Sequence, residues 1–197
     1  MFQFIESIRI KGGCVEQLGF HQTRVNKTFL NFGKQPYFQL QEVINADSLI
    51  TNAVAKCRIQ YDLDRIIEIT YSEYAIKIIN TISLAELDGR KYDFKYADRE
   101  WISDMLLKSG TDEIIMTDEG IVKDASYANL AFYDGELWYT PESPLLEGTR
   151  RAFLLETKKI QPREISVSDL HQYQHVKFIN AMMSWDESPI LSMALLS

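Results

Sequence analysis

The chain has 197 residues, enough to bury a substantial core as one domain or two small lobes. Its 46% hydrophobic and 25% charged residues are typical of a globular protein and exclude disorder throughout. The formal net charge of -7 argues against nucleic acid or an anionic membrane as the main partner, although a local basic pocket is compatible with it.

The N-terminus lacks the features of a signal peptide, and no apolar run reaches the roughly 20 residues of a membrane span. Cys14 and Cys57 form neither a Cys-x-x-Cys pair nor a disulfide framework. We therefore expect a cytoplasmic enzyme or binding protein.

The first elements predicted are a strand and a helix. Residues 2–10, FQFIESIRI, alternate as a strand does, and Gly12-Gly13 supplies the turn that ends it. Apolar residues spaced by three and four predict an amphipathic helix over 21–32, closed by Gly33.

The next region predicts a second helix and then a small sheet. The helix is expected over 39–56. Three runs rich in Ile and Tyr follow, separated by short polar turns, at 56–63, 65–72 and 74–83. These runs predict three strands in an antiparallel meander.

A different pattern follows the turn signal Asp88-Gly89. Residues 98–109 predict a helix with Asp98 as its cap and Gly110 at its end. Glu119-Gly120 and Asp134-Gly135 suit tight turns. The remaining expected elements are hairpins over 113–123 and 129–140, a helix over 146–157 entered through Gly148, a short helix over 168–173 and a strand over 175–180.

This order of elements predicts an α+β fold without internal repeats or a low-complexity linker. We expect a small N-terminal lobe over 1–88 and a larger C-terminal lobe over 89–197. The boundary near residue 88 would then be a hinge between packed lobes.

Common catalytic motifs are missing from the sequence. It has no phosphate-binding loop with Lys-Ser/Thr and no Gly-x-Ser-x-Gly, and His21, His171 and His175 are scattered. We expect no metal site.

Lys95 is one of the candidates that remain. It lies between Phe94 and Tyr96, where desolvation would lower the pKa of its amine and make it nucleophilic. A lysine whose stem covers apolar surface while its amine stays in water is the alternative.

The second candidate is the start of the helix at Gly148-Thr149-Arg150-Arg151. Backbone N–H groups and the helix dipole at such a start favour an anion such as phosphate. A capped helix with solvent-facing arginines is the alternative, and Arg24 is equally ambiguous alone.

The order of these motifs along the chain is more informative than any one of them. The series is His21-x-x-Arg24, Lys95-x-x-x-Arg99, Gly120-x-x-x-Asp124, Asn129, Thr140-Pro141, Gly148-x-x-Arg151 and Asn180-Ala181-Met182-Met183. It resembles the class IV aminotransferase family, the fold-type IV pyridoxal 5'-phosphate (PLP) enzymes, from residue 4 to about residue 190. The resemblance implies a two-lobed fold-type IV enzyme, PLP as cofactor, a small-molecule amine as substrate and a homodimer.

The resemblance also implies a role for each matching residue. Lys95 would form the Schiff base with PLP and shuttle protons. Asp124, where the family has glutamate, would pair with the pyridine nitrogen, and Asn129 would organise the strand behind it. The residues that would hold the cofactor phosphate are Arg24, Gly148, Thr149, Arg150, Asn180 and Ala181.

Three features depart from the family pattern. Asp124 is one methylene shorter than glutamate, so its carboxylate must come from a closer backbone. Arg150 stands where a small residue is usual. Lys95 comes early in the chain, which implies a shortened N-terminal lobe.

The segment Asn180-Ala181-Met182-Met183 and the pair Asp98-Arg99 after Lys95 resemble 4-amino-4-deoxychorismate lyase within the family. The resemblance therefore implies release of pyruvate from aminodeoxychorismate to give 4-aminobenzoate, a folate precursor. The alternatives are an amino acid aminotransferase, of the branched-chain or D-amino acid type, and a PLP-binding relative without catalytic activity.

Overall fold

The computed structural model describes residues 2–46 and 53–196, and its chain divides into two compact units. The first unit contains residues 1–75 and 94–98, and the second contains 76–93 and 99–197. This division differs from the boundary expected at residue 88. The segment from residue 76 belongs with the second unit because its strand pairs there, while residues 94–98 return to the first.

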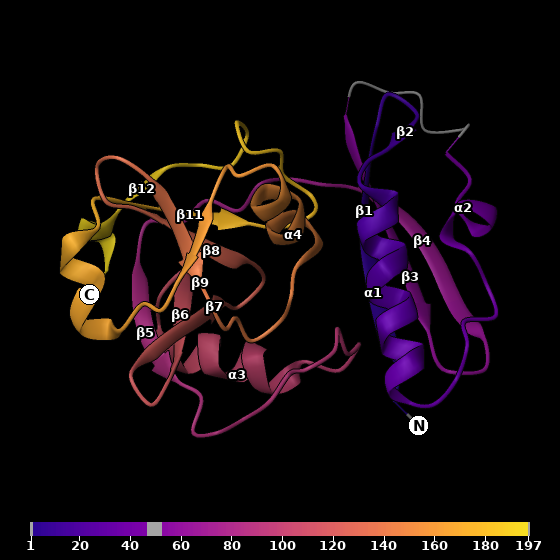
Figure 1. Ribbon diagram of the computed structural model, residues 1–197, viewed down its shortest axis with the longest axis horizontal. Coiled ribbons are helices and arrows are strands. Elements are labelled where there is room, and N and C mark those ends of the chain that lie inside the picture. Colours follow the sequence, from indigo (N-terminus) through magenta and orange to yellow (C-terminus); the bar gives the residue numbers. More distant parts are fainter. Residues whose placement is uncertain (1, 47–52, 197) are drawn as a thin grey trace. The chain divides into compact units, whose positions relative to one another are not determined.

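The first unit is a four-stranded antiparallel sheet covered on one face by a helix (Figure 1). The strand order is β2-β1-β3-β4, and helix α1 packs its buried Val25 and Phe29 against the apolar residues of the sheet. The bounds are β1 Phe4–Lys11, β2 Cys14–Val15, α1 Leu18–Asn31, α2 Leu40–Val43, β3 Val54–Tyr61 and β4 Ile66–Glu73.

Two predictions in this unit are confirmed and one is wrong. The strand and helix expected over 2–10 and 21–32 are β1 and α1, and Gly33 follows α1 with a φ of 68°. The helix expected over 39–56 shrinks to the four residues of α2, and residues 47–52 of that prediction lie outside the described residues. From Val54 the side chains alternate between buried and half-buried, and β3 pairs with both β1 and β4.

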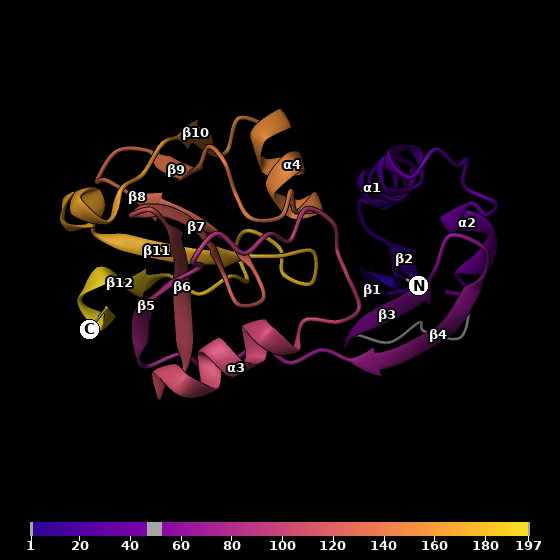
Figure 2. The same cartoon turned by 90° about the horizontal axis from the view of Figure 1, so that it is seen from below.

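The second unit contains two sheets. The three-stranded sheet has the order β5-β6-β7 and contacts helix α3, as Figure 2 shows. The five-stranded sheet has the order β10-β9-β8-β11-β12, and α4 packs Leu154 against its residues Ala131 and Ile179. The bounds are β5 Ile82–Glu86, α3 Glu100–Ser109, β6 Glu113–Asp118, β7 Ile121–Ala125, β8 Asn129–Tyr133, β9 Trp138–Pro141, α4 Thr149–Glu156, β10 Gln161–Arg163, β11 His175–Ile179 and β12 Leu191–Ser192.

The predicted three-stranded meander is wrong in its third strand. β3 and β4 do pair antiparallel, but the strand expected over 74–83 begins only at Ile82. It then runs parallel to β6 in the other unit. The chain leaves the first sheet after β4, so β4 and β5 follow each other in the sequence but do not pair.

The predicted cap of α3 is also wrong, whereas its predicted end is confirmed. The helix begins at Glu100, preceded by Arg99 rather than by Asp98 as the cap residue. Gly110 ends it in the left-handed conformation, with a φ of 67°.

The remaining local predictions hold with shifted ends. Glu119-Gly120 connects β6 to β7, and Asp134-Gly135 lies in the connection between β8 and β9. Helix α4 starts at Thr149 rather than at 146, with Gly148 before it. The short helix near the C-terminus is a 3₁₀ helix, η2 (Val167–Gln172), and the strand after it is β11. Within residues 2–46 and 53–196, every helix is too short or too polar to cross a membrane.

Candidate functional site

A buried ionic cluster in the first unit joins β1 to α1. The side chain of Glu6 on β1 is 0% exposed, and that of Arg24 on α1 is 13% exposed. Arg24 donates from Nε to Glu6 Oε1 at 2.8 Å and from Nη2 to Glu6 Oε2 at 2.6 Å. His21 Nδ1 lies 2.6 Å from the same Oε2. The side chains of Arg24 and His21 thus meet at one buried carboxylate, that of Glu6.

The surroundings of this carboxylate keep it ionised. Burial of Glu6 opposes its charge, but the charge of Arg24 and the hydrogen bonds from His21 and Arg24 outweigh burial and lower the pKa of Glu6 to about 2. Burial lowers the pKa of His21, against the pull of Glu6. A neutral His21 then carries its proton on Nδ1 and donates it to Glu6.

Lys95 belongs to the same unit, on a segment that lies along β1. The Ile5 N–H donates to the Lys95 carbonyl at 2.9 Å, and Phe4 and Tyr96 form an antiparallel bridge. The charge of Lys95 also helps to lower the pKa of His21, which places the two side chains in electrostatic range. The structure therefore places Lys95 in the same unit as Arg24 and His21, on a segment whose backbone pairs with β1 next to Glu6.

A second buried carboxylate, that of Asp124, lies on β7 in the second unit. Asn129, the first residue of β8, donates from Nδ2 to Asp124 Oδ1 at 2.7 Å. The Leu146 N–H donates to Asp124 Oδ2 at 2.8 Å, and the Leu146 carbonyl accepts from Asn129 Nδ2 at 2.7 Å. Asp124 and Asn129 thus fix the chain just before Gly148.

The pKa of Asp124 moves in the opposite direction from that of Glu6. Burial raises the pKa of Asp124 to about 7, although hydrogen bonds from Asn129 and the backbone and the charge of Arg151 act against it. The donors that touch Asp124 are neutral amides. A carboxylate can accept about four hydrogen bonds, so this one has capacity for a further donor.

Gly148 is required by the approach of the Asn129 side chain. A Cβ at this position would lie 1.9 Å from Asn129 Oδ1, well inside the contact distance. The backbone of Gly148 has an ordinary φ of −74°, so the requirement is for space and not for an unusual conformation. Asp124, Asn129 and the start of α4 are consequently one packed unit.

The two arginines of α4 are buried, so the alternative of a capped helix with solvent-facing arginines is wrong. Arg151 is 7% exposed and donates from Nη2 to the Pro141 carbonyl at 2.8 Å. Its Nε reaches Thr140 Oγ1 at 3.2 Å. Arg151 therefore ties the start of α4 to the end of β9.

Arg150 connects α4 to the segment after β11. It is 5% exposed, and its Nη2 lies 3.4 Å from the Ala181 carbonyl, a long hydrogen bond. Asn180 turns the chain here, because its Oδ1 accepts from the Met182 N–H at 2.8 Å. Thr149, Arg150, Asn180 and Ala181 are thus gathered at one end of the five-stranded sheet.

The predicted residues therefore form two groups, one in each unit. Arg24 and Lys95 are in the first, and the other predicted residues are in the second. Glu6 was missed, although a single acid in the apolar strand FIESIRI was a signal that it is buried. Arg151 was visible in the motif but was not assigned to the site.

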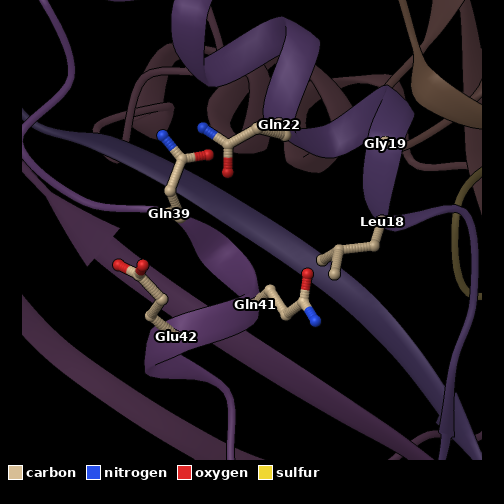
Figure 3. A pocket seen from close by; sticks show the side chains of 6 residues that line it. All are labelled: Leu18, Gly19, Gln22, Gln39, Gln41 and Glu42. Atoms are coloured by element: carbon tan, nitrogen blue, oxygen red, sulfur yellow. The ribbon is translucent and has the colours of Figure 1, made fainter.

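A separate pocket on the first unit contains none of the predicted residues. Figure 3 shows its lining of Leu18, Gly19, Gln22, Gln39, Gln41 and Glu42, contributed by α1, α2 and the residue before α2. Gln22 is engaged within the fold, since its Oε1 accepts from the Leu40 N–H at 2.8 Å. Across 2–46 and 53–196, no group of three His, Cys, Asp or Glu side chains is arranged to hold a metal ion.

Comparison with known proteins identifies the family. The family described as amino-transferase class IV matches residues 3–187. The chain belongs to the class IV amino-transferase family. The predicted α+β fold of the fold-type IV kind and the prediction of an enzyme of this family are thereby confirmed.

Individual proteins with similar sequences and structures agree with this assignment. An uncharacterised protein of Haemophilus influenzae is 36% identical over 186 residues, which cover 92% of this chain and 98% of that protein. A crystal structure from Haemophilus somnus, of a protein proposed to be a 4-amino-4-deoxychorismate lyase, is 36% identical with a TM-score of 0.86. The match covers 92% of this chain and 97% of the other.

A more distant structure shares the fold. It is a hypothetical aminotransferase of Mycobacterium tuberculosis in its PLP-bound form, with 14% identity and a TM-score of 0.76. The match covers 96% of this chain and 80% of the other.

Proposed function

We propose that this enzyme is a PLP-dependent lyase that converts 4-amino-4-deoxychorismate to 4-aminobenzoate and pyruvate. The choice of reaction is supported by the 36% identity to the Haemophilus somnus protein over nearly the whole chain. The cofactor is supported by family membership and above all by the environment of Asp124.

The residues of the second unit fit the two polar ends of PLP. Asp124 is a buried carboxyl group whose hydrogen-bond donors in the contacts above are neutral amides, so a protonated ring nitrogen would add a cationic donor in direct contact. Thr149 and the following N–H groups of α4 lie at a helix start, which favours a phosphate. PLP, when bound, supplies an electron sink for a carbanion of the substrate.

Arg24 would contribute only modestly to binding of the cofactor phosphate. Two of the five N–H donors of its guanidinium are directed at Glu6, which also balances much of its charge. Its fixed orientation beside Glu6 suits a contact with a phosphate oxygen, while the charge balance keeps its net attraction modest.

Lys95 is the residue that we assign to proton transfer. It would remove a proton from the ring carbon of the substrate as the C–O bond to the enolpyruvyl group breaks. The electrons of the C–H bond complete the aromatic ring, and the departing enolpyruvate takes up a proton to become pyruvate. Atoms balance between one substrate and two products, and no oxidant is required.

The cofactor proposal is tested by the absorbance of the purified protein after addition of PLP. We expect a band of bound cofactor in the near ultraviolet or visible region that Lys95→Ala removes. Lys91→Ala, which changes an exposed lysine four residues earlier, should leave the band intact. A wild-type protein that PLP cannot colour would contradict the cofactor assignment.

The reaction is tested by separate assays on the loaded enzyme. With 4-amino-4-deoxychorismate we expect equal amounts of pyruvate and 4-aminobenzoate. With an amino acid and 2-oxoglutarate we expect no glutamate. Glutamate without pyruvate would favour the aminotransferase alternative, and PLP binding without either product would favour the non-catalytic one.

The proposal includes a homodimer in the cytoplasm that contributes to folate synthesis, as the family resemblance implies. Equilibrium sedimentation of the loaded protein tests the dimer, and a mass of one chain would contradict it. The role in folate synthesis is tested by deleting the gene. We expect the deletion strain to grow only when 4-aminobenzoate is supplied.

A further inference from the structure

The loop of residues 126–128 connects the strand of Asp124, which is assigned to the ring of the cofactor, to Asn129, which donates a hydrogen bond to Asp124. It begins just after β7, which carries Asp124, and ends at Asn129, where β8 starts. The Ala125 N–H donates to the Ala128 carbonyl at 2.9 Å and closes the turn. Any displacement of this loop would therefore shift both Asp124 and Asn129.

Two charged side chains hold the backbone of Ser126 in this loop. The Ser126 N–H donates to Glu113 Oε1 at 3.0 Å. The Ser126 carbonyl accepts from Arg99 Nη2 at 2.7 Å. The side chain of Glu113 is 0% exposed, and its Oε1 also accepts from the Ile114 N–H at 3.0 Å. One residue of the loop is thus held on both its polar backbone atoms.

Lys77 contacts both Glu113 and Tyr127, a residue of the loop. Its Nζ lies 2.9 Å from Glu113 Oε2 and 5.5 Å from the centre of the Tyr127 ring. The Tyr127 ring stacks on Phe178 of β11 with 6.1 Å between centroids and 3° between planes. Side chains from the start of α3, from β6 and β11 and from the segment before β5 therefore surround this loop.

These side-chain contacts are more than are needed to form a turn of this length. The hydrogen bond between Ala125 and Ala128 closes the turn without any side chain. Burying the carboxylate of Glu113 carries a large desolvation cost unless hydrogen bonds and a counter-charge offset it. Such a cost is reasonable where the exact position of the loop matters.

We propose that Arg99 and Glu113 are positioning residues that hold Asp124 and Asn129 where the ring of the cofactor binds. This inference rests on the proposed function for the identity of the ligand. Neither residue is assigned a contact with substrate or cofactor. They act through the Ser126 peptide groups, which they fix from opposite sides.

The backbone of Arg99 also takes part in the start of α3. Its carbonyl accepts from the Ile102 N–H at 3.1 Å and from the Ser103 N–H at 3.3 Å, so it also opens the helix. The same residue follows Lys95 by four positions in the chain. A change of the Arg99 side chain therefore releases the loop after Asp124 but leaves these backbone hydrogen bonds of α3 in place.

The experiment compares Arg99→Ala, Arg99→Lys and Glu113→Gln with the wild type and with Arg90→Ala. Arg90 is an exposed arginine of the same unit, near Trp101, and is the matched control. The first measurement is the dissociation constant of PLP. We expect it to rise about tenfold in Arg99→Ala, less in Arg99→Lys and Glu113→Gln, and not in Arg90→Ala.

The second measurement needs no cofactor. Carbon-13 NMR of aspartate carboxyl groups in the unloaded protein follows the titration of Asp124, whose signal is identified by its absence in Asp124→Asn. In Arg99→Ala, loosening of the loop should admit water and move the pKa of Asp124 from about 7 towards 3.8. Arg90→Ala should titrate as the wild type does.

The outcomes separate the two proposals. Variants that melt earlier but titrate and bind PLP as the wild type does would overturn the positioning role, because only stability would then depend on these contacts. A wild type that binds no PLP would overturn the proposed function, while the NMR comparison would still decide whether Arg99 and Glu113 position Asp124.

Discussion

Glu6 is buried in the first unit of this enzyme and Asp124 in the second, and the two carboxyl groups have opposite surroundings. Glu6 in the first unit has a cation beside it, since Arg24 donates two hydrogen bonds to it, and the pKa of Glu6 falls to about 2. Asp124 in the second unit accepts hydrogen bonds from amides, and its pKa rises to about 7. Burial alone therefore does not determine the charge of a carboxyl group.

The two carboxyl groups differ in whether a cation of this chain donates hydrogen bonds to them directly. Glu6 has its counter-charge already, so we regard it as a residue that fixes Arg24 on α1. Asp124 gains most from a ligand that brings a positive hydrogen-bond donor. A protonated pyridine ring has this property, which is why the environment of Asp124 is central to the proposed function.

The largest effect is expected from Asp124→Asn, which removes the charge that the ring nitrogen needs. Turnover should fall roughly a thousandfold, the equivalent of ~4 kcal/mol in the activation barrier. Asp124→Glu should keep most of the activity, because it retains the carboxylate. Steady-state assays of pyruvate release measure both, and an active Asn variant would show that the acid is dispensable.

The next largest effect should come from Glu6→Gln, which breaks the pair with Arg24. Removing one partner of a buried ion pair costs about 3–5 kcal/mol, and the small exposure of Arg24 places this change in that range. Urea denaturation measures it. Glu68→Gln, at a surface pair 4.0 Å from Arg58, is the control and should change stability by less than about 1 kcal/mol.

The same pair predicts a pH dependence. The pKa of Glu6 is about 2 in the folded protein against 4.5 in the unfolded chain, so its stabilising contribution is present above pH 4.5 and is lost as the pH falls towards 2. The Gln variant should lack this dependence, and equal acid sensitivity in both proteins would contradict the assignment.

Asp124 should give stability a pH dependence opposite to that of Glu6. Its folded pKa is about 7 against 3.8 unfolded, so its contribution to stability is full below pH 3.8 and is lost as the pH rises to 7. Without cofactor, the wild type should lose about 3 kcal/mol relative to Asp124→Asn between pH 4 and 7. Parallel denaturation curves for the two proteins at both pH values would refute this.

A smaller effect is expected from Gly148→Ala. The new Cβ would lie 1.9 Å from Asn129 Oδ1, so Asn129 must move away from Asp124, at a cost of about 2 kcal/mol. Gly19→Ala on α1 is the control, because nothing lies within 4 Å of the added Cβ there. Thermal unfolding compares the two, and equal stability would show that Asn129 adapts easily.

Local patterns in the sequence predicted most of the single elements. The strand predicted from FQFIESIRI, the Glu119-Gly120 turn and the glycine after α3 each depend on nearby residues, and each is found in the structure, although successive residues of β1 are buried rather than alternating. Strand pairing was less predictable, because β5 joins β6 across the whole of α3, through the parallel register Ile82 to Glu113 and Glu86 to Thr117.

The candidate site shows the same limit. The motif series placed Asp124 and Asn129 five residues apart in the chain, and the structure brings them into a hydrogen bond. The partners that determine their chemistry come from distant segments, such as Leu146 for Asp124 and Glu113 for the loop. Nothing in the local pattern around Glu113 indicated that its carboxylate is buried against Ser126.

The most direct test of the central claim is the NMR titration of Asp124 in wild-type protein before and after saturation with PLP. We predict a pKa near 7 without cofactor and a pKa well below it with cofactor, because the protonated ring nitrogen stabilises the carboxylate. A pKa near 4 in the unloaded protein, or a pKa that PLP leaves unchanged, would contradict this account.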